Sequence, residues 1–161
     1  MRLKLLACEI LYREICACIA RSRNIVDVEF LPKGLHDLGA AAMRERVQAA
    51  VDSVDPAAYQ AVALGYALCG TGLAGVEARS LPVVLPRAHD CITLFLGGAE
   101  RYAEYFNGHP GVYFKTTGWI ERGASLVPLS RERTGIGQTY GELAAKYGED
   151  NAMYLFDLLG A

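Results

Sequence analysis

Residues 61–68 read AVALGYAL, an uninterrupted apolar run near the middle of a chain of 161 residues. A run of this length without alternating polar positions is typical of a β-strand that is buried on both faces. Strands of this kind belong to parallel sheets, whose two faces are covered by helices. The patterns on either side of the run therefore set the fold class.

Strand and helix patterns alternate before this run. Residues 25–31 alternate apolar and acidic side chains, which predicts a strand. Residues 39–54 carry an apolar stripe at helical spacing, and residues 10–22 carry a second one that includes Cys18. Residues 3–7 add a short apolar strand at the start of the chain.

The sequence after the run is less regular. A glycine-rich segment leads to an apolar strand at residues 82–86 and then to a helical pattern at residues 92–106, with Gly97-Gly98 as a candidate break. Beyond Gly108 the signals weaken, and we predict a strand over residues 112–116, a loop over 121–138 and a helix over 140–159.

Alternating strands and helices joined by right-handed crossovers predict an α/β fold. We expect a three-layer domain with a mostly parallel sheet of four to five strands flanked by helices. The length suits a single α/β domain spanning residues 1–161.

Composition excludes two classes of partner. The net charge is −2 with no basic block, so the electrostatic footprint of a nucleic-acid-binding protein is missing. Residues 56–76 carry no charge and are long enough to span a bilayer, but they contain Pro56, Gln60 and four glycines. They divide into a strand and a loop, so we expect no membrane partner.

The segment Leu5-Leu6-Ala7-Cys8 resembles a lipoprotein cleavage box. The apolar stretch before it is only a few residues long, whereas a signal peptide needs about 7–15. We therefore expect a cytoplasmic protein, in which thiols stay reduced. The odd count of five cysteines, without paired spacing, agrees with this expectation.

Reactive side chains follow several of the predicted strands. They are Cys8-Glu9, His36-Asp37, Cys69 and His89-Asp90-Cys91. Because the carboxyl ends of parallel strands meet at one edge of the sheet, we expect these residues to gather there. A single free cysteine is readily explained as a small buried apolar residue. Three of them at strand ends, beside Glu, His and Asp, favour a functional site.

A metal site is the first interpretation. Cys8, Cys69, Cys91 and His89 offer the thiolate and imidazole ligands that zinc prefers. Glu9 or Asp90 would carry a proton or orient a ligand as the catalytic group. The sequence contains no C-x-x-C or H-x-x-x-H pair, so this hypothesis depends on folding.

Thiol chemistry without a metal is the alternative. Cys91 would lie in the first turn of a helix, where the dipole and free amides lower a thiol pKa, with His89 as its base. Asp90 is also a good helix N-cap, which would explain it without chemistry. His36 either joins the site or merely closes its loop.

The segment Gly70-Thr71-Gly72-Leu73-Ala74-Gly75 matches the dinucleotide-binding pattern. Only residues 76–80 separate it from the next strand, which is too short for the usual crossover helix. We instead expect Gly70 and Gly72 to let backbone amides approach a cofactor, and Trp119 to form the floor of a pocket or fill the core. Cys16 and Cys18 lie within a predicted helix, and we expect no chemistry from them.

Several segments together resemble the family of proteins of unknown function numbered 1638. They are Ala7-Cys8-Glu9, Gly65-Tyr66-Ala67-Leu68-Cys69-Gly70, Pro86-Arg87-Ala88-His89-Asp90-Cys91, Leu96-Gly97, Pro110-Gly111-Val112-Tyr113 and Gly118-Trp119. The resemblance implies a cytoplasmic prokaryotic protein, with Cys8, Cys69, His89, Asp90 and Cys91 as site residues. Family members continue beyond the helix that ends here near Leu159, which leaves open whether this chain is truncated.

The resemblance also implies a metabolic setting, because genes of this family often lie beside corrinoid-dependent methyltransferases and corrinoid proteins. We therefore expect a zinc-like metal-binding protein linked to corrinoid-dependent methyl transfer or one-carbon metabolism. Its partners would be a small-molecule substrate and a corrinoid protein or methyltransferase, which would supply the corrinoid. Two alternatives stay open: a metal-free cysteine-nucleophile enzyme, and a non-catalytic accessory module that binds a corrinoid protein.

Overall fold

The computed structural model describes residues 1–112, 114–122 and 140–159. Contacts between residues divide the chain into two compact units, Met1–Arg122 and Gly123–Ala161. The first unit holds the sheet and every reactive segment singled out above, so the site is described within that unit alone.

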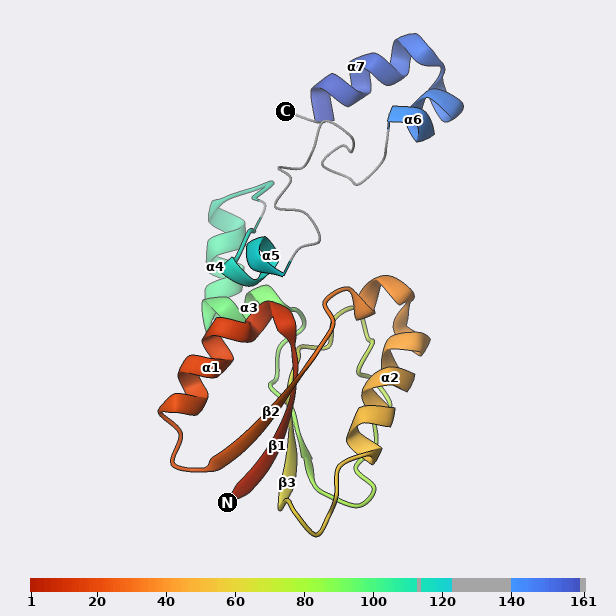
Figure 1. Cartoon of the computed structure of the whole chain (residues 1–161). Helices are drawn as coiled ribbons and strands as arrows, with labels where there is room; N and C mark the ends of the chain where they lie inside the picture. Colours follow the sequence, from red (N-terminus) through yellow and green to blue (C-terminus); the bar gives the residue numbers. More distant parts are fainter. Residues whose placement is uncertain (113, 123–139, 160–161) are drawn as a thin grey trace. The chain divides into compact units, whose positions relative to one another are not determined.

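Four parallel strands form the sheet, in the order β2-β1-β3-β4 (Figure 1). Their bounds are Arg2–Cys8 for β1, Ile25–Leu31 for β2, Ala61–Gly65 for β3 and Val83–Val84 for β4. The prediction of a parallel sheet with four to five strands is confirmed. The run at residues 61–68 supplies β3, which pairs with β1 and with β4.

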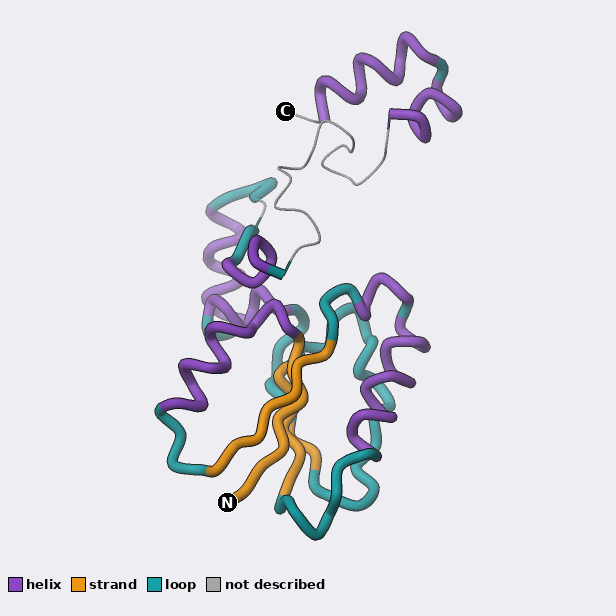
Figure 2. The backbone as a smooth tube through the Cα atoms, in the orientation of Figure 1, coloured by secondary structure: helices purple, strands orange, loops and turns teal. Residues whose placement is uncertain are grey.

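Helices cover both faces of this sheet and complete three layers (Figures 1 and 2). A short 3-10 helix η1 (Glu9–Leu11) leads from β1 into α1 (Tyr12–Ala20), which packs on one face. On the other face, the 3-10 helix η2 (Leu35–Leu38) precedes α2 (Ala40–Asp52). The chain moves outward from β1 to β2 and then returns past β1 to β3. This reversal makes a topological switch point between β1 and β3, where ligands of open α/β sheets bind.

The main core lies between the sheet and α2. Met43, Val47 and Val51 of α2 pack with buried residues of the strands, which include Leu6, Val62 and Leu64. Burying each such side chain contributes roughly 1.5–3 kcal/mol to the stability of the fold. This layer therefore stabilises the sheet at whose edge the site lies. By contrast, α1 has no fully buried residue, and Cys18, expected within its apolar stripe, is exposed.

Glycines divide two of the predicted helical segments. The pattern at residues 92–106 forms α3 (Cys91–Leu96) and α4 (Ala99–Gly108), broken as expected at Gly97 and Gly98, whose φ angles are +85° and +153°. In the second unit, α6 (Tyr140–Tyr147) and α7 (Glu149–Leu159) replace the single helix predicted there. Gly148 separates them with φ of +81°, a left-handed value that favours glycine.

Other expectations need correction or fall outside the described residues. The strand over residues 82–86 shrinks to the two residues of β4, and β3 ends three residues early at Gly65. Residues 112 and 114–116, the described part of the strand expected over 112–116, form no strand. Most of the loop expected over 121–138 lies outside the described residues. None of the helices in the described ranges is long and apolar enough to cross a bilayer.

Candidate functional site

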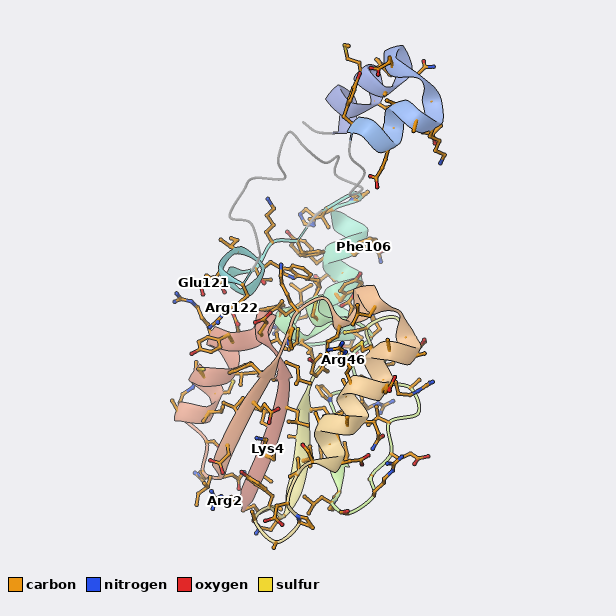
Figure 3. The ribbon with its side chains drawn as sticks, turned by 45° about the vertical axis from the view of Figure 1, so that its right-hand side comes forward. Arg2, Lys4, Arg46, Phe106, Glu121 and Arg122 are labelled. Atoms are coloured by element: carbon orange, nitrogen blue, oxygen red, sulfur yellow. The ribbon has the colours of Figure 1, made fainter. Side chains whose placement is uncertain are left out.

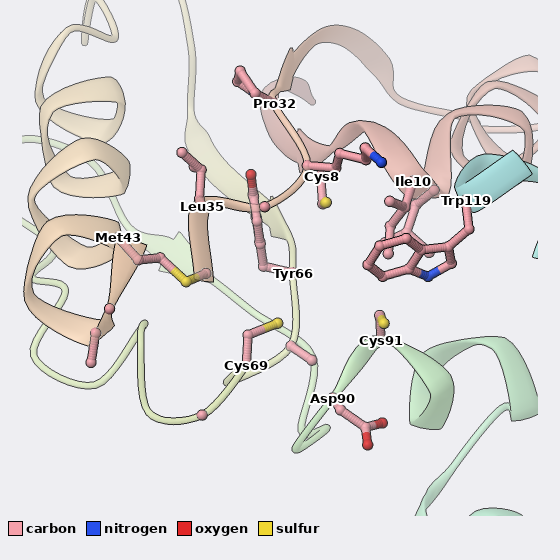
Figure 4. A pocket seen from close by; sticks show the side chains of 17 residues that line it. Cys8, Ile10, Pro32, Leu35, Met43, Tyr66, Cys69, Asp90, Cys91 and Trp119 are labelled. Atoms are coloured by element: carbon pink, nitrogen blue, oxygen red, sulfur yellow. The ribbon is translucent and has the colours of Figure 1, made fainter. Parts of the chain in front are cut away.

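A cavity of about 480 Å³ lies where β1 and β3 end, at the switch point of the sheet (Figure 4). Segments that follow three strands form its wall together with α2, α3 and a short helix, α5 (Thr117–Glu121). The residues that line it are Cys8, Ile10, Leu11, Pro32, Lys33, Gly34, Leu35, Gly39, Ala40, Met43, Tyr66, Ala67, Cys69, Gly70, Asp90, Cys91 and Trp119.

Three thiols converge on this cavity from three different elements. Cys8 ends β1, Cys69 follows β3, and Cys91 begins α3, and their sulfur atoms point into the same space in Figure 4. All three cysteines are free and partly buried. The expectation that strand ends would gather thiols at one edge of the sheet is met by the geometry of these three residues.

Burial and mutual repulsion keep these thiols protonated. The pKa of Cys8 is raised to about 11, mainly by burial and also by the nearby Cys69 and Glu9, while the backbone N–H of Ile10 and the charge of Lys33 lower it. Desolvation likewise raises the pKa of Cys91 to about 11, with added contributions from Cys69, Asp90 and Cys8. The pKa of Cys69 is also raised, first by burial and then by Asp90. The raised pKa values agree with the placement of the three thiols around one cavity.

Left-handed backbone brings Cys69 to the cavity. Cys69 and Thr71 have φ of +46° and +71°, a conformation that few residues other than glycine adopt and that often occurs at functional sites. Leu68 donates its N–H to the carbonyl of Ala88 at 3.0 Å, and Cys69 donates to that of His89 at 2.9 Å. These bonds extend the pairing beyond β3 and set Cys69 alongside the start of α3.

Asp90 is the N-cap of α3, as one of its two interpretations predicted. Its Oδ1 accepts the N–H of Thr93 at 2.8 Å and the hydroxyl of Thr93 at 2.9 Å. The same residue lines the cavity beside Cys91. The pKa of Cys91 was expected to be lowered at the helix start but is raised, because burial and the neighbouring Cys69, Asp90 and Cys8 outweigh the backbone N–H that lowers it.

The structure does not bring His89 to the three thiols. Its ring lies 3.1 Å from Thr93 Oγ1 through Nε2 and 3.1 Å from Asp90 Oδ2 through Nδ1. It also packs edge-on against Tyr102, with 4.6 Å between ring centroids. The side chain is 53% exposed and is not among the residues that line the cavity. His89 and Cys91 are separated by one residue, yet only Cys91 lines the cavity.

Glu9 holds the loop that closes one side of the cavity. Its Oε1 accepts the backbone N–H of Lys33 at 2.7 Å, which fastens the segment after β2 to the end of β1. Glu9 itself does not line the cavity, whereas Lys33 does, with its Nζ 5.5 Å from the centre of the Trp119 ring. Lys33 was not singled out in the sequence, because nothing there shows which loop residue reaches a cavity.

Tyr66 is a second residue that the sequence did not single out. It is only 3% exposed, and its hydroxyl oxygen is buried without a hydrogen-bond partner. Burial raises its pKa, and the charges of Cys8, Cys69 and Glu9 raise it further. The available signal was a tyrosine near the end of the apolar run, since a phenol buried in a parallel sheet needs a partner for its hydroxyl.

Trp119 reaches the cavity because α5 is fastened against α1. Arg13 Nε donates to Glu121 Oε2 at 2.8 Å, and the guanidinium of Arg122 lies 4.0 Å from the centre of the Tyr12 ring. Figure 3 shows Glu121 and Arg122 beside α1. Gly118 contacts the backbone of Ile10 so closely that a Cβ there would overlap the Ile10 carbonyl. Trp119 is therefore part of the cavity wall, as one of its two interpretations predicted.

The glycine-rich segment, residues 70–75, contributes less to the cavity wall than expected. Gly70 lines the cavity, but Gly72 does not, and a Cβ at Gly72 would overlap the side chain of Met43. Residues 69–75 form turns, and no helix follows them before β4. Cys16 and Cys18 lie on α1 away from the lining. His36 is placed in η2, and its side chain lies outside the described part of the structure.

The described side chains include no group of three His, Cys, Asp or Glu residues already arranged to hold a metal ion. The three thiols would have to close on an ion to bind it together. The cavity thus provides soft donor atoms, an apolar wall and a few polar groups.

Comparisons with known proteins identify a family without a known activity. The model of the family described as "Protein of unknown function (DUF1638)" matches residues 30–158. The matched span includes Cys69, Cys91 and Trp119 and begins after Cys8. No curated protein matches the chain, and neither does any solved structure.

Proposed function

The chain belongs to the DUF1638 family of proteins of unknown function, and from the geometry of its cavity we propose that it binds a zinc-like metal ion through Cys8, Cys69 and Cys91. The observation that carries this proposal is the convergence of three thiols on one cavity at the switch point of the sheet. Three separate elements supply them, so no local packing requirement of one helix or strand explains all three.

The raised pKa values of Cys8 and Cys91, both about 11, support a metal more than a free nucleophile. A thiol nucleophile needs a lowered pKa and a nearby base. Cys91 has a raised pKa, and His89 faces Asp90, Thr93 and Tyr102 instead. A bound dication would add positive charge directly beside the thiols, and thiols that bind zinc are deprotonated outright.

Three cysteine ligands would leave one coordination position of a tetrahedral ion open, as in catalytic zinc sites. The metal would supply Lewis acidity toward a thiol, a water molecule or a methylated substrate bound there. The surrounding residues are mainly apolar, so they would exclude bulk water and strengthen electrostatic interactions inside. We propose that the reaction belongs to corrinoid-dependent methyl transfer or one-carbon metabolism, with a corrinoid protein or methyltransferase as partner.

Among the described acidic residues, Asp90 is the better placed proton carrier, because it lines the cavity while Glu9 does not. Asp90 already accepts two hydrogen bonds through Oδ1, and its Oδ2 lies beside His89. His89 would then orient Asp90 rather than bind the metal. This assignment replaces the four-ligand set of the sequence hypothesis with three cysteines.

Elemental analysis tests the metal directly. Protein purified without chelator or an affinity metal should contain about one equivalent of zinc or a similar ion, or take it up on reconstitution. Substituting serine for Cys8, Cys69 or Cys91 should each abolish stoichiometric binding, whereas C16S and C18S should retain it. Failure of the wild-type protein to bind zinc, cobalt or iron, or retention of metal by all three variants, would overturn the proposal.

A further inference from the structure

The metal proposal assigns no role to two polar groups in the cavity wall, the Lys33 ammonium group and the Tyr66 hydroxyl. The charged side chains of the lining are those of Lys33 and Asp90. Asp90 caps α3, whereas the ion pairs found among the described residues do not include Lys33. Its Nζ lies over the ring of Trp119, 5.5 Å from the ring centre.

The second group is the hydroxyl of Tyr66. It is buried and makes no hydrogen bond within the described residues, although a buried donor left unpaired costs about 1–3 kcal/mol. Figure 4 shows this hydroxyl on the Cys8 side of the cavity, toward Pro32 and Leu35. Such an orphan donor in a cavity wall is explained by a ligand atom that accepts from it.

Lys33 and Tyr66 lie on the same side of the cavity. The backbone N–H of Lys33 is bonded to Glu9, the residue after Cys8, and the Tyr66 hydroxyl lies on the Cys8 side of the cavity in Figure 4. Both residues therefore lie near the end of β1. The carboxylate of Glu9 is also close, but it accepts the backbone N–H of Lys33 and lies outside the lining. Glu9 therefore adds negative charge near the end of β1 from outside the cavity lining.

The rest of the wall is apolar. Leu35 and Met43 line the α2 side, while Ile10 and Trp119 line the opposite side (Figure 4). A volume of about 480 Å³ falls within the range of small-molecule sites. An apolar cavity with one cation and one unpaired hydroxyl at the same end suits a ligand with an apolar body and an oxyanion at one end.

We propose that the cavity binds a small organic acid, whose carboxylate accepts a hydrogen bond from the Tyr66 hydroxyl and faces the Lys33 ammonium group. The apolar body of the acid lies against Trp119, Leu35 and Met43. This inference concerns the same cavity as the proposed metal site, but it requires no metal to be bound.

Trp119 is the single tryptophan of the sequence, so its fluorescence reports on the cavity alone. Metal-free, reduced protein titrated with octanoate should show a saturable change in that fluorescence. Octanamide and 1-octanol, which match the chain but lack the charge, should bind about 10-fold more weakly, the difference expected for a lost charge-assisted hydrogen bond.

Two variants test whether the carboxylate of octanoate binds at Lys33 and Tyr66. K33M and Y66F should each weaken octanoate binding by about 10-fold, and K33M should leave octanamide binding within about twofold. K115M removes an exposed lysine that does not line the cavity, and it should bind octanoate like the wild type. Urea unfolding monitored by circular dichroism establishes that each variant is folded.

Equal binding of octanoate and octanamide would overturn the inference, and so would unchanged octanoate binding by folded K33M and Y66F. Because the protein carries no metal in this experiment, its failure leaves the metal proposal standing. Conversely, octanoate selectivity in a protein that never binds metal would support the acid site and refute only the metal.

Discussion

The thiols of Cys8 and Cys91 are weak acids in this fold, since burial and neighbouring negative groups raise the pKa of each to about 11. A thiol reacts as the thiolate, so a raised pKa leaves little of the reactive form near pH 8. In metal-free protein, iodoacetamide should therefore modify the exposed Cys18 faster than either cavity cysteine at pH 8. The rates at Cys8 and Cys91 should rise steeply as the pH approaches 11.

Peptide mapping by mass spectrometry measures these rates residue by residue. The urea-unfolded chain is the control, and all five cysteines should react at similar rates in it. Fast alkylation of Cys91 near neutral pH would contradict the account and favour the metal-free nucleophile instead.

Asp90 has a structural role that can be separated from any chemical one. Removing the cap with D90A should lower the free energy of unfolding by about 1 kcal/mol, because the N–H of Thr93 loses its acceptor. D90N keeps an oxygen that can cap and should lie within about 0.5 kcal/mol of the wild type. Urea denaturation measures both values.

If D90N were as destabilised as D90A, the negative charge of Asp90, and not its hydrogen bond to Thr93, would account for its contribution to stability.

At the level of single residues, the positions of the three cavity cysteines could be predicted better than those of the residues around them. Cys8, Cys69 and Cys91 could be found because each follows a recognisable strand, and strand ends converge. The position of the His89 side chain could not be predicted, because its direction depends on contacts with Thr93 and Tyr102. Tyr66 and Lys33 were missed because an unpaired hydroxyl or ammonium group is recognised only once its surroundings are known.

At the scale of elements, patterns with a clear period were the ones that could be predicted. The alternation in residues 25–31 matches β2 over the same range, and the apolar stripe of residues 39–54 matches α2 within two residues at each end. The strand over residues 82–86 shortens to β4, since Pro82 and Pro86 lack the N–H that extends a ladder. An apolar run in the sequence does not show at which residue the hydrogen bonds between neighbouring strands end.

The contact between α5 and η1 provides a test at this scale. Gly118 packs against the carbonyl of Ile10, so the added methyl group of G118A must push α5 away from α1. We expect G118A to lower the free energy of unfolding by about 1–3 kcal/mol and to alter Trp119 fluorescence as the indole leaves the cavity.

G108A is the matched control, since a Cβ at Gly108 in α4 meets no atom within 4 Å. It should leave both the stability and the fluorescence almost unchanged. A G118A protein as stable as G108A, with the fluorescence of the wild type, would show that the close approach of α5 does not position Trp119.

At the scale of the whole molecule, the strand order determines where the site lies. Reversal of the chain between β1 and β3 opens a space at their carboxyl ends. The end of β1, the turn after β3 and the start of α3 each bring one thiol to this space. The fold class and this edge could be inferred from alternating strands and helices. The volume and apolar character of the cavity could not, because they arise from side chains contributed by six separate segments.

The central claim is that one metal ion is held by three cysteines, and X-ray absorption at the zinc edge tests it most directly. For the zinc-loaded protein, the account predicts three sulfur neighbours at about 2.3 Å and one lighter neighbour at about 2.0 Å. A zinc shell made only of nitrogen and oxygen atoms, or a protein that cannot be loaded with zinc, would contradict it.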